Sequence, residues 1–144
     1  MTARGLTALA LTASLGCQRA PVASCADDLG GVWRGPAGRY QLLDSRARLE
    51  LYPLFAELPA GLPPGVVAAP AVIDLTRAEA ALPTGTMTRR YERGARFCRV
   101  STPARLIGCG GARLTLTVIP PPPPVDWERC VADAGAPIEL ALTR

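Results

Sequence analysis

Cysteine is the residue type in this chain best able to do covalent chemistry. There are five, at Cys17, Cys25, Cys98, Cys109 and Cys130. The chain has no histidine, so a Ser–His or Cys–His pair and an imidazole metal ligand are excluded. No two cysteines have CxxC spacing, so neither redox catalysis nor zinc binding is supported. We therefore expect disulfides and lipid attachment, with no metal and no cofactor.

Cys17 closes an amino-terminal segment with the layout of a secretory signal. One charged residue, Arg4, precedes an apolar run over residues 6–15. This run is about half the roughly twenty residues that a helix needs to cross a bilayer. Small residues follow it, ending with Gly16 and Cys17.

This ending resembles a bacterial lipoprotein signal, in which a small residue precedes the cysteine that becomes acylated. Gly16 and Cys17 match that pattern, whereas Ser14 and Leu15 reverse the usual order of leucine and then a small residue. The resemblance covers the first 17 residues. It implies a signal peptide over residues 1–16 and lipid attachment at Cys17.

A second lipobox candidate ends at Cys25, where residues 22–25 read Val-Ala-Ser-Cys. This tetrapeptide fits the motif better. However, Arg19 and Pro21 interrupt the apolar segment just upstream, and a charge there is costly in the membrane. We therefore favour Cys17, and a plain secreted protein without acylation remains the other alternative.

If Cys17 carries the lipid, four cysteines remain, and an even number suits an oxidising, exported compartment. Four cysteines allow three pairings. A proline turn predicted at residues 102–105 would set Cys98 opposite Cys109 on paired strands. This register favours Cys98–Cys109 together with Cys25–Cys130. The alternative of Cys25–Cys98 with Cys109–Cys130 stays open.

Arginine supplies the second group of chemically capable side chains. All 16 basic residues are arginine, and six gather in one stretch that holds a single acid, Glu92. The six are Arg89, Arg90, Arg93, Arg96, Arg99 and Arg105. One interpretation is a set of exposed strand faces whose long side chains cover apolar surface. The other is an anion-binding patch, because guanidinium forks match phosphate and carboxylate oxygens.

In a cell envelope the anions within reach of such a patch would be lipid head groups and acidic polysaccharide. Export makes nucleic acid an unsuitable partner, despite a sequence pI near 9.1. The membrane itself would be a partner through the lipid on Cys17.

Carboxylates are the remaining candidates for catalysis. Asp74, Glu92, Asp126 and Glu128 could in principle supply an acid and a base. Their spacing singles out no pair, and no glycine-rich phosphate loop joins a strand to a helix. We therefore predict that the protein is not an enzyme, and a carboxylate-based hydrolase ranks third among the hypotheses.

The elements that position these residues are predicted to be strands. Residues 112–119 alternate apolar and polar side chains, which is typical of a strand with one buried face. Similar runs cover residues 38–43, 46–55, 66–77, 85–93 and 138–144. The 15 prolines and 14 glycines are scattered and indicate many turns. A loop is expected over residues 56–65 and a helical turn over 78–82.

These patterns predict an all-β fold: a small antiparallel up-and-down barrel, or a barrel-like sandwich, of eight or nine short strands. A signal peptide over residues 1–16 and a flexible tether over residues 17–28 would precede a single domain over residues 29–144.

Gly31-Val32-Trp33 resembles the opening strand of lipocalin-like and avidin-like barrels. These families often carry an arginine that packs on this tryptophan, and the resemblance implies that Arg144 or Arg113 has that part. It further implies a cup for a small apolar ligand. A barrel of this size would leave that cup narrow or filled by side chains.

The sequence as a whole predicts a cell-envelope lipoprotein, anchored in the outer membrane and facing the periplasm. A soluble periplasmic or secreted protein is the alternative. Its β-domain would act as a binding or structural module, and a carrier of a small apolar ligand is the competing hypothesis.

Overall fold

The computed structural model describes residues 25, 27–55, 58–110 and 112–144, and all regular structure in them is β-strand. The strands are β1 (Gly31–Gly35), β2 (Gly38–Asp44), β3 (Arg48–Pro53), β4 (Val66–Ala68), β5 (Val72–Ala78), β6 (Ala81–Arg93), β7 (Arg96–Gly110), β8 (Arg113–Val118), β9 (Pro124–Asp126), β10 (Val131–Ala132) and β11 (Ile138–Thr143). No helix in these ranges is long and apolar enough to cross a bilayer.

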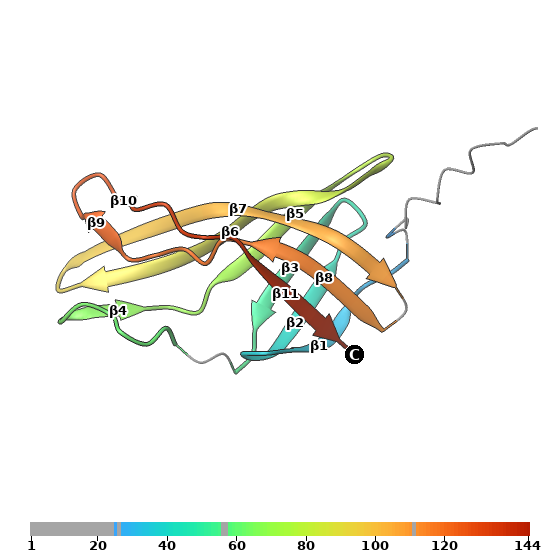
Figure 1. The fold of residues 1–144 in the computed structure, drawn as a ribbon, viewed down its shortest axis with the longest axis horizontal. Helices are drawn as coiled ribbons and strands as arrows, with labels where there is room; N and C mark the ends of the chain where they lie inside the picture. Colours follow the sequence, from blue (N-terminus) through green and yellow to red (C-terminus); the bar gives the residue numbers. More distant parts are fainter. Residues whose placement is uncertain (1–24, 26, 56–57, 111) are drawn as a thin grey trace, which may run out of the picture.

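Eight strands close an antiparallel barrel in the order β1-β2-β3-β5-β6-β7-β8-β11, with β11 returning to β1 (Figure 1). Each barrel strand pairs with its neighbours along the chain, so the topology is up-and-down. The short β4 adds to β6 outside the ring, and β9 and β10 form a separate small hairpin. The predicted all-β barrel is confirmed.

Alternation along the strands gives the barrel its apolar interior. In β8, Leu114, Leu116 and Val118 are each 1% exposed, as their period of two predicts. The strand predicted near the carboxyl terminus is β11, in which Leu140 is 6% exposed. Leu142 is fully buried, whereas Ile138 at the start of the strand is half exposed.

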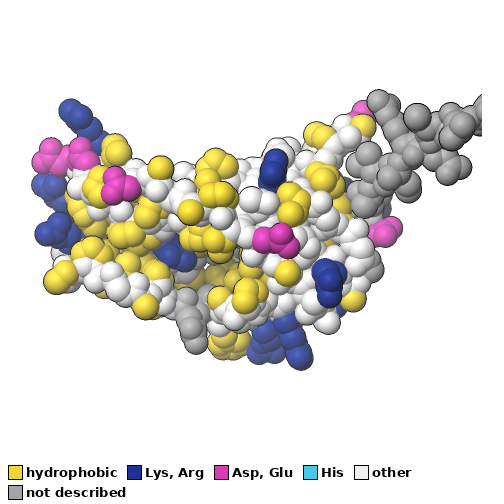
Figure 2. Space-filling model, in the orientation of Figure 1, with side chains coloured by type: hydrophobic (Ala, Val, Ile, Leu, Met, Phe, Trp, Pro, Cys, Tyr) yellow, Lys and Arg dark blue, Asp and Glu magenta, His cyan; other side chains and the backbone are white. Residues whose placement is uncertain are grey.

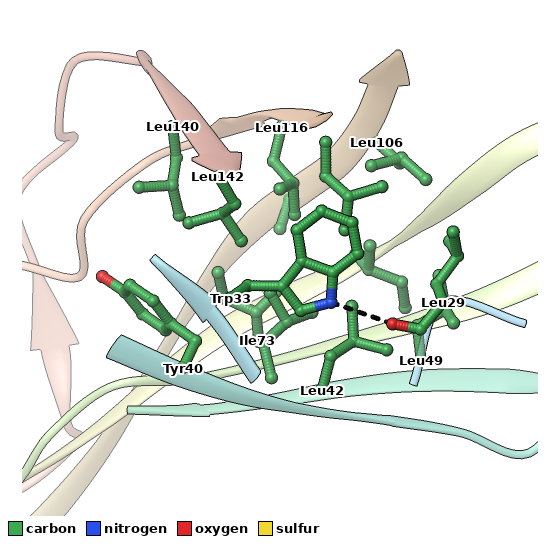
Figure 3. Packing of buried hydrophobic residues seen from close by; sticks show 14 of the residues in the cluster. Leu29, Trp33, Tyr40, Leu42, Leu49, Ile73, Leu106, Leu116, Leu140 and Leu142 are labelled. Atoms are coloured by element: carbon green, nitrogen blue, oxygen red, sulfur yellow. Dashed lines mark hydrogen bonds between the residues drawn. The ribbon is translucent and has the colours of Figure 1, made fainter. Parts of the chain in front are cut away.

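Side chains fill one end of the barrel, around Trp33 (Figure 3). Trp33 has no exposed surface, and its indole Nε1–H donates to the backbone oxygen of Leu29 at 2.9 Å. The side chains packed with it are mainly leucines: Leu42, Leu49, Leu51, Leu75, Leu106, Leu114, Leu116, Leu140 and Leu142. This agrees with the size of an eight-stranded barrel, whose interior is just wide enough for side chains.

The hairpin of β6 and β7 is much longer than the rest of the barrel wall, with strands of 13 and 15 residues. It projects well beyond the barrel and turns at Gly94, whose φ of 60° suits glycine (Figure 1). A second apolar cluster lies along the hairpin: Val66, Ala68, Tyr91 and Val100, with Trp127 packed against it.

The turn predicted at residues 102–105 is wrong, because β7 runs straight through Pro103. Pro103 lies where the pairing of β7 with β8 ends, and its carbonyl oxygen accepts the Ile119 N–H at 3.3 Å. Proline has no N–H group that could donate a ladder hydrogen bond to β8. The hydroxyl of Thr102 donates to the backbone oxygen of Ile119 instead. A proline is tolerated at a place where the ladder stops.

Neither predicted disulfide pairing is correct. The bonds are Cys25–Cys109 and Cys98–Cys130. Without the turn, Cys98 and Cys109 lie on one continuous strand, separated by roughly 36 Å at the normal rise of a strand. A bulge between Leu106 and Gly108 shifts the register, so that Cys109 pairs with the buried Leu114 and reaches Cys25.

Contacts with the barrel also extend to Cys25, before residue 29. Within the predicted tether, Cys25 is 7% exposed and bonded to Cys109, and the Arg77 guanidinium donates to its backbone oxygen. The predicted signal peptide and Cys17 lie outside the described residues.

Two further predictions of local structure are corrected. The run at residues 66–77 is divided into β4 and β5, with Pro70 between them. The helical turn expected at residues 78–82 is instead the β5–β6 hairpin, in which Ala80 has a φ of 59°.

Candidate functional site

The two ends of the barrel differ, and one is sealed by the segment that precedes β1. The Leu29 N–H donates to Asp44 Oδ2 at 2.9 Å, and the Arg77 guanidinium binds the same carboxylate. Arg77 also donates to the backbone oxygen of Cys25, and the Cys25–Cys109 disulfide fixes the segment to β7. This end is therefore held shut by covalent and polar contacts.

Arg144 completes the sealed end. Its Cζ lies 4.8 Å from the centroid of the Trp33 ring, and its Nη2 donates to the backbone oxygen of Gly30 at 3.0 Å. A guanidinium over an indole face is a favourable cation–π contact. Of the two arginines suggested by the barrel resemblance, Arg144 has this position, whereas Arg113 is exposed.

Asp44 is charged at neutral pH and holds the sealed end together. Its side chain is 3% exposed, and burial raises the pKa of the carboxyl group. Hydrogen bonds from the N–H groups of Leu29 and Arg46 and from Arg77 outweigh that effect. The net result is a pKa below the ordinary value, which favours the ion pair with Arg77.

One face of the molecule, beside β6, is hollowed. Figure 2 shows a hollow between the β3–β4 connection and β6, walled mostly by hydrophobic side chains, with a basic side chain visible inside it. The chain has no lysine, so this side chain is an arginine. A concave surface of this composition is the usual form of a small-molecule site.

Arg89 is the arginine that β6 presents to this interior. The strand alternates, so Met87, Arg89 and Tyr91 share the inner face, and Arg89 lies in register with the buried Val100. Met87 packs against the Trp33 cluster, and Tyr91 belongs to the cluster along the hairpin. Arg89 thus stands between the two apolar clusters. Its Nε is shielded from solvent and has no hydrogen-bond partner in the described part of the chain.

Tyr40 on β2 is the buried tyrosine of the Trp33 cluster. It is 9% exposed, and in Figure 3 it lies at the margin of the cluster with its hydroxyl pointing away from Trp33. Burial raises the pKa of the Tyr40 hydroxyl, and the positive charge of Arg89 opposes that rise.

The six arginines predicted as one anion-binding patch are distributed over different surfaces. Arg89 faces inward, whereas Arg90 and Arg99 are register partners on the outer face. Arg93 and Arg96 flank the turn of the hairpin. Arg105 lies roughly 20 Å along β7 from Arg99 at the normal rise of a strand.

The tip of the β6–β7 hairpin carries a separate pocket. Its volume is about 400 Å³, and Arg93, Ala95, Arg96 and Trp127 line it. Arg96 Nη1 lies 3.7 Å from Glu128 Oε1, so part of its charge is already paired. The Cys98–Cys130 disulfide holds the β9–β10 segment against this tip.

The four carboxylates considered for catalysis have separate structural partners. Arg48 binds Asp74, and this hydrogen bond lowers the pKa of Asp74. Arg90 binds Glu92, and Asp126 accepts the backbone N–H groups of Glu128 and Arg129. Across the described ranges, no three potential metal ligands gather. These contacts favour structural roles for the carboxylates.

Comparison with protein-family models, curated proteins and solved structures finds no match for this chain.

Sequence reasoning did not single out Arg89 from its neighbours. The signal is present in the run over residues 85–93, where alternation puts Thr86, Thr88, Arg90 and Glu92 on one polar face. The period of two then puts Arg89 on the apolar face. The Asp44–Arg77 contact had no such signal, because it joins residues far apart in the sequence.

Proposed function

We propose that this protein is an exported β-barrel that binds a small apolar molecule in the hollow beside β6. The observation that carries the proposal is the contrast between the two parts of the interior. One end is sealed around Trp33, and the other presents a concave, mostly hydrophobic surface (Figure 2). Exposed apolar surface of this kind is costly in water and commonly marks a ligand site.

Export is supported by the cysteines. Cys25, Cys98, Cys109 and Cys130 are all paired, as expected in an oxidising compartment. The sulfur of Cys25 is committed to Cys109, so Cys25 has no thiol left for acylation. This supports Cys17 as the lipid attachment site and an envelope lipoprotein, anchored in the outer membrane and facing the periplasm.

Ligand binding is tested with a neutral apolar fluorophore, N-phenylnaphthylamine. The protein is the full chain carrying Cys17→Ser, which removes the proposed acylation site. We expect saturable binding, with one fluorophore per chain, that an uncharged apolar alcohol displaces. Fluorescence that rises linearly without saturation would contradict the proposal.

Two variants locate the binding. Met87→Trp enlarges a side chain on the inner face of β6, and Thr88→Trp makes the same change on the outer face. We expect Met87→Trp to weaken fluorophore binding and Thr88→Trp to leave it unchanged. Denaturation midpoints of both variants check that each is folded.

The hairpin tip favours a second candidate function, contact with anionic lipid head groups. The supporting observation is the pocket between Arg93, Arg96 and Trp127 beside the exposed Phe97. Replacing Arg93, Arg96 and Arg99 with Ser should weaken co-sedimentation with anionic vesicles in low salt. Replacing the exposed Arg34, Arg39 and Arg113 is the matched control. Equal co-sedimentation of the two variants would exclude a specific role for the tip.

A further inference from the structure

Arg89 differs from the two arginines at the sealed end. Arg77 binds the Asp44 carboxylate and the Cys25 oxygen, and Arg144 packs on Trp33. Nε of Arg77 is also shielded and unbonded, but its terminal nitrogens have these partners. Within the described residues no carboxylate forms an ion pair with Arg89.

A partly buried guanidinium between apolar clusters loses hydration, and that loss is unfavourable unless an acceptor replaces the water. Arg89 lies on the inner face of β6, the strand that borders the hollow, and Figure 2 shows a basic side chain within that hollow. An acceptor on the ligand would form a hydrogen bond with the shielded Nε. The low local dielectric would strengthen this bond.

We propose that Arg89 binds the anionic end of the ligand, which is an apolar molecule with a single terminal carboxylate or phosphate ester. This inference rests on the proposed function, because it assigns the chemistry of the molecule in the same hollow. A guanidinium fork matches both kinds of oxyanion, since it presents two parallel N–H donors. The apolar part of the ligand would lie against the hydrophobic walls that Figure 2 shows.

Tyr40 offers a second donor to the same group. Its hydroxyl points away from the filled core and remains protonated at neutral pH, because burial raises its pKa above the ordinary value. It comes from β2, whereas Arg89 comes from β6, so the two donors approach from different walls of the barrel. A ligand with one anionic end would be oriented by both, with its apolar part away from them.

The test compares three ligands that share one apolar chain: dodecanoate, dodecyl phosphate and dodecanol. Each displaces N-phenylnaphthylamine from the full chain carrying Cys17→Ser. We expect at least one of the anionic ligands to bind about tenfold or more tightly than dodecanol, as a charge-assisted hydrogen bond would give. The tighter of the two anions distinguishes a fatty acid from a phosphate ester.

Arg89→Met keeps a long side chain and removes the charge. We expect it to abolish the preference for the anionic ligands over dodecanol. Arg90→Met, the same change on the outer face of β6, should keep the preference. The comparison of dodecanoate with dodecanol also uses the protein that keeps Arg89. It therefore remains informative if Arg89→Met fails to fold.

The outcomes separate the two proposals. Equal affinity for all three ligands with the Arg89 protein would overturn the role of Arg89 and leave the apolar site standing. If Arg89→Met binds all three ligands more weakly by the same factor, the role of Arg89 in binding the anion is likewise overturned and the apolar site stands. If none of the three displaces the fluorophore and the fluorophore itself does not saturate, the binding function fails as well.

Discussion

The neighbours of Arg77, Arg144 and Arg89 decide what each of these side chains does. Arg77 has a carboxylate and a carbonyl oxygen, and Arg144 has an indole face and a carbonyl oxygen. Both therefore stabilise the sealed end. Arg89 has apolar neighbours along β6 and a shielded Nε without a protein acceptor in the described ranges, and this leaves it suited to a ligand.

Removing the charge at Arg144 should destabilise the sealed end. Arg144→Gln loses the contact with the Trp33 ring and the hydrogen bond to Gly30. We expect the free energy of unfolding to fall by about 1 kcal/mol, measured by chemical denaturation. Arg113→Gln, an exposed change on the neighbouring strand, is the control and should cost less than about 0.5 kcal/mol.

Asp44 should make stability depend on pH in acid. Its pKa in the folded protein is below the ordinary value of about 4, so its stabilising effect is complete above that pH. The effect is lost as the pH falls from about 4 through the folded pKa. Asp44→Asn should therefore flatten this acid dependence, measured by denaturation across the acid range.

The same variant leaves Arg77, whose side chain is 16% exposed, without its charge partner. We expect it to cost about 3 kcal/mol at neutral pH. Asp133→Asn, at an exposed position, should leave stability at neutral pH nearly unchanged. An Asp44→Asn protein as stable as that control would contradict the role given to the ion pair.

At the scale of strands, the alternation of apolar residues predicts the fold because one buried face per strand is a local property. β8 and β3 follow it throughout, with Leu49, Leu51, Leu114 and Leu116 all inside. The prediction of a turn at Pro103 is wrong because the contact that accommodates this proline joins two residues that are distant in the sequence. The donor that replaces the proline N–H is the Thr102 hydroxyl, and its acceptor, Ile119, lies on another strand.

The contact between β5 and β6 depends on glycine at position 85. A Cβ there would lie 1.9 Å from the backbone oxygen of Asp74, and the backbone has no room to give. Gly85→Ala should cost about 3 kcal/mol or more, or prevent folding. Gly108→Ala is the matched control, since its Cβ would meet nothing closer than 3.9 Å. Similar denaturation midpoints for the two variants would contradict this packing.

The two disulfides join different parts of the chain and should differ in effect. Cys25–Cys109 spans a sequence separation of 84 residues and Cys98–Cys130 one of 32. By loop closure, losing the first should cost about 4.5 kcal/mol and losing the second about 3.7 kcal/mol. Chemical denaturation of two variants, each with both cysteines of one disulfide replaced by Ala, checks which loss is larger. A non-reducing peptide map checks which cysteines are joined. A peptide joining Cys98 to Cys109 would contradict the continuous β7.

The pairing itself could not be predicted from the sequence, because it depends on which strands become neighbours in the closed barrel. Cys109 reaches Cys25 only because a bulge shifts the register of β7 against β8. The sequence did indicate the four participating cysteines. The barrel resemblance indicated Arg144 or Arg113 as the partner of Trp33, and Arg144 has that position. The hollow beside Arg89 is a property of the closed barrel and has no local signature.

On the scale of the whole molecule, the sealed end and the hairpin tip lie at opposite ends of the long axis (Figure 1). A lipid on Cys17 would tether the protein from the side of Cys25, which is the sealed end. The tip with Arg93 and Arg96 would then point away from the anchoring membrane. On this arrangement the hollow stays open to the periplasm, where a ligand can enter it.

The most direct test of the account is a crystal structure of the protein grown with dodecanoate. We predict the alkyl chain in the hollow beside β6, with its carboxylate against the Arg89 guanidinium and the Tyr40 hydroxyl. A hollow filled by the protein's own side chains would contradict the account, as would dodecanoate bound only at the hairpin tip by Arg93 and Arg96.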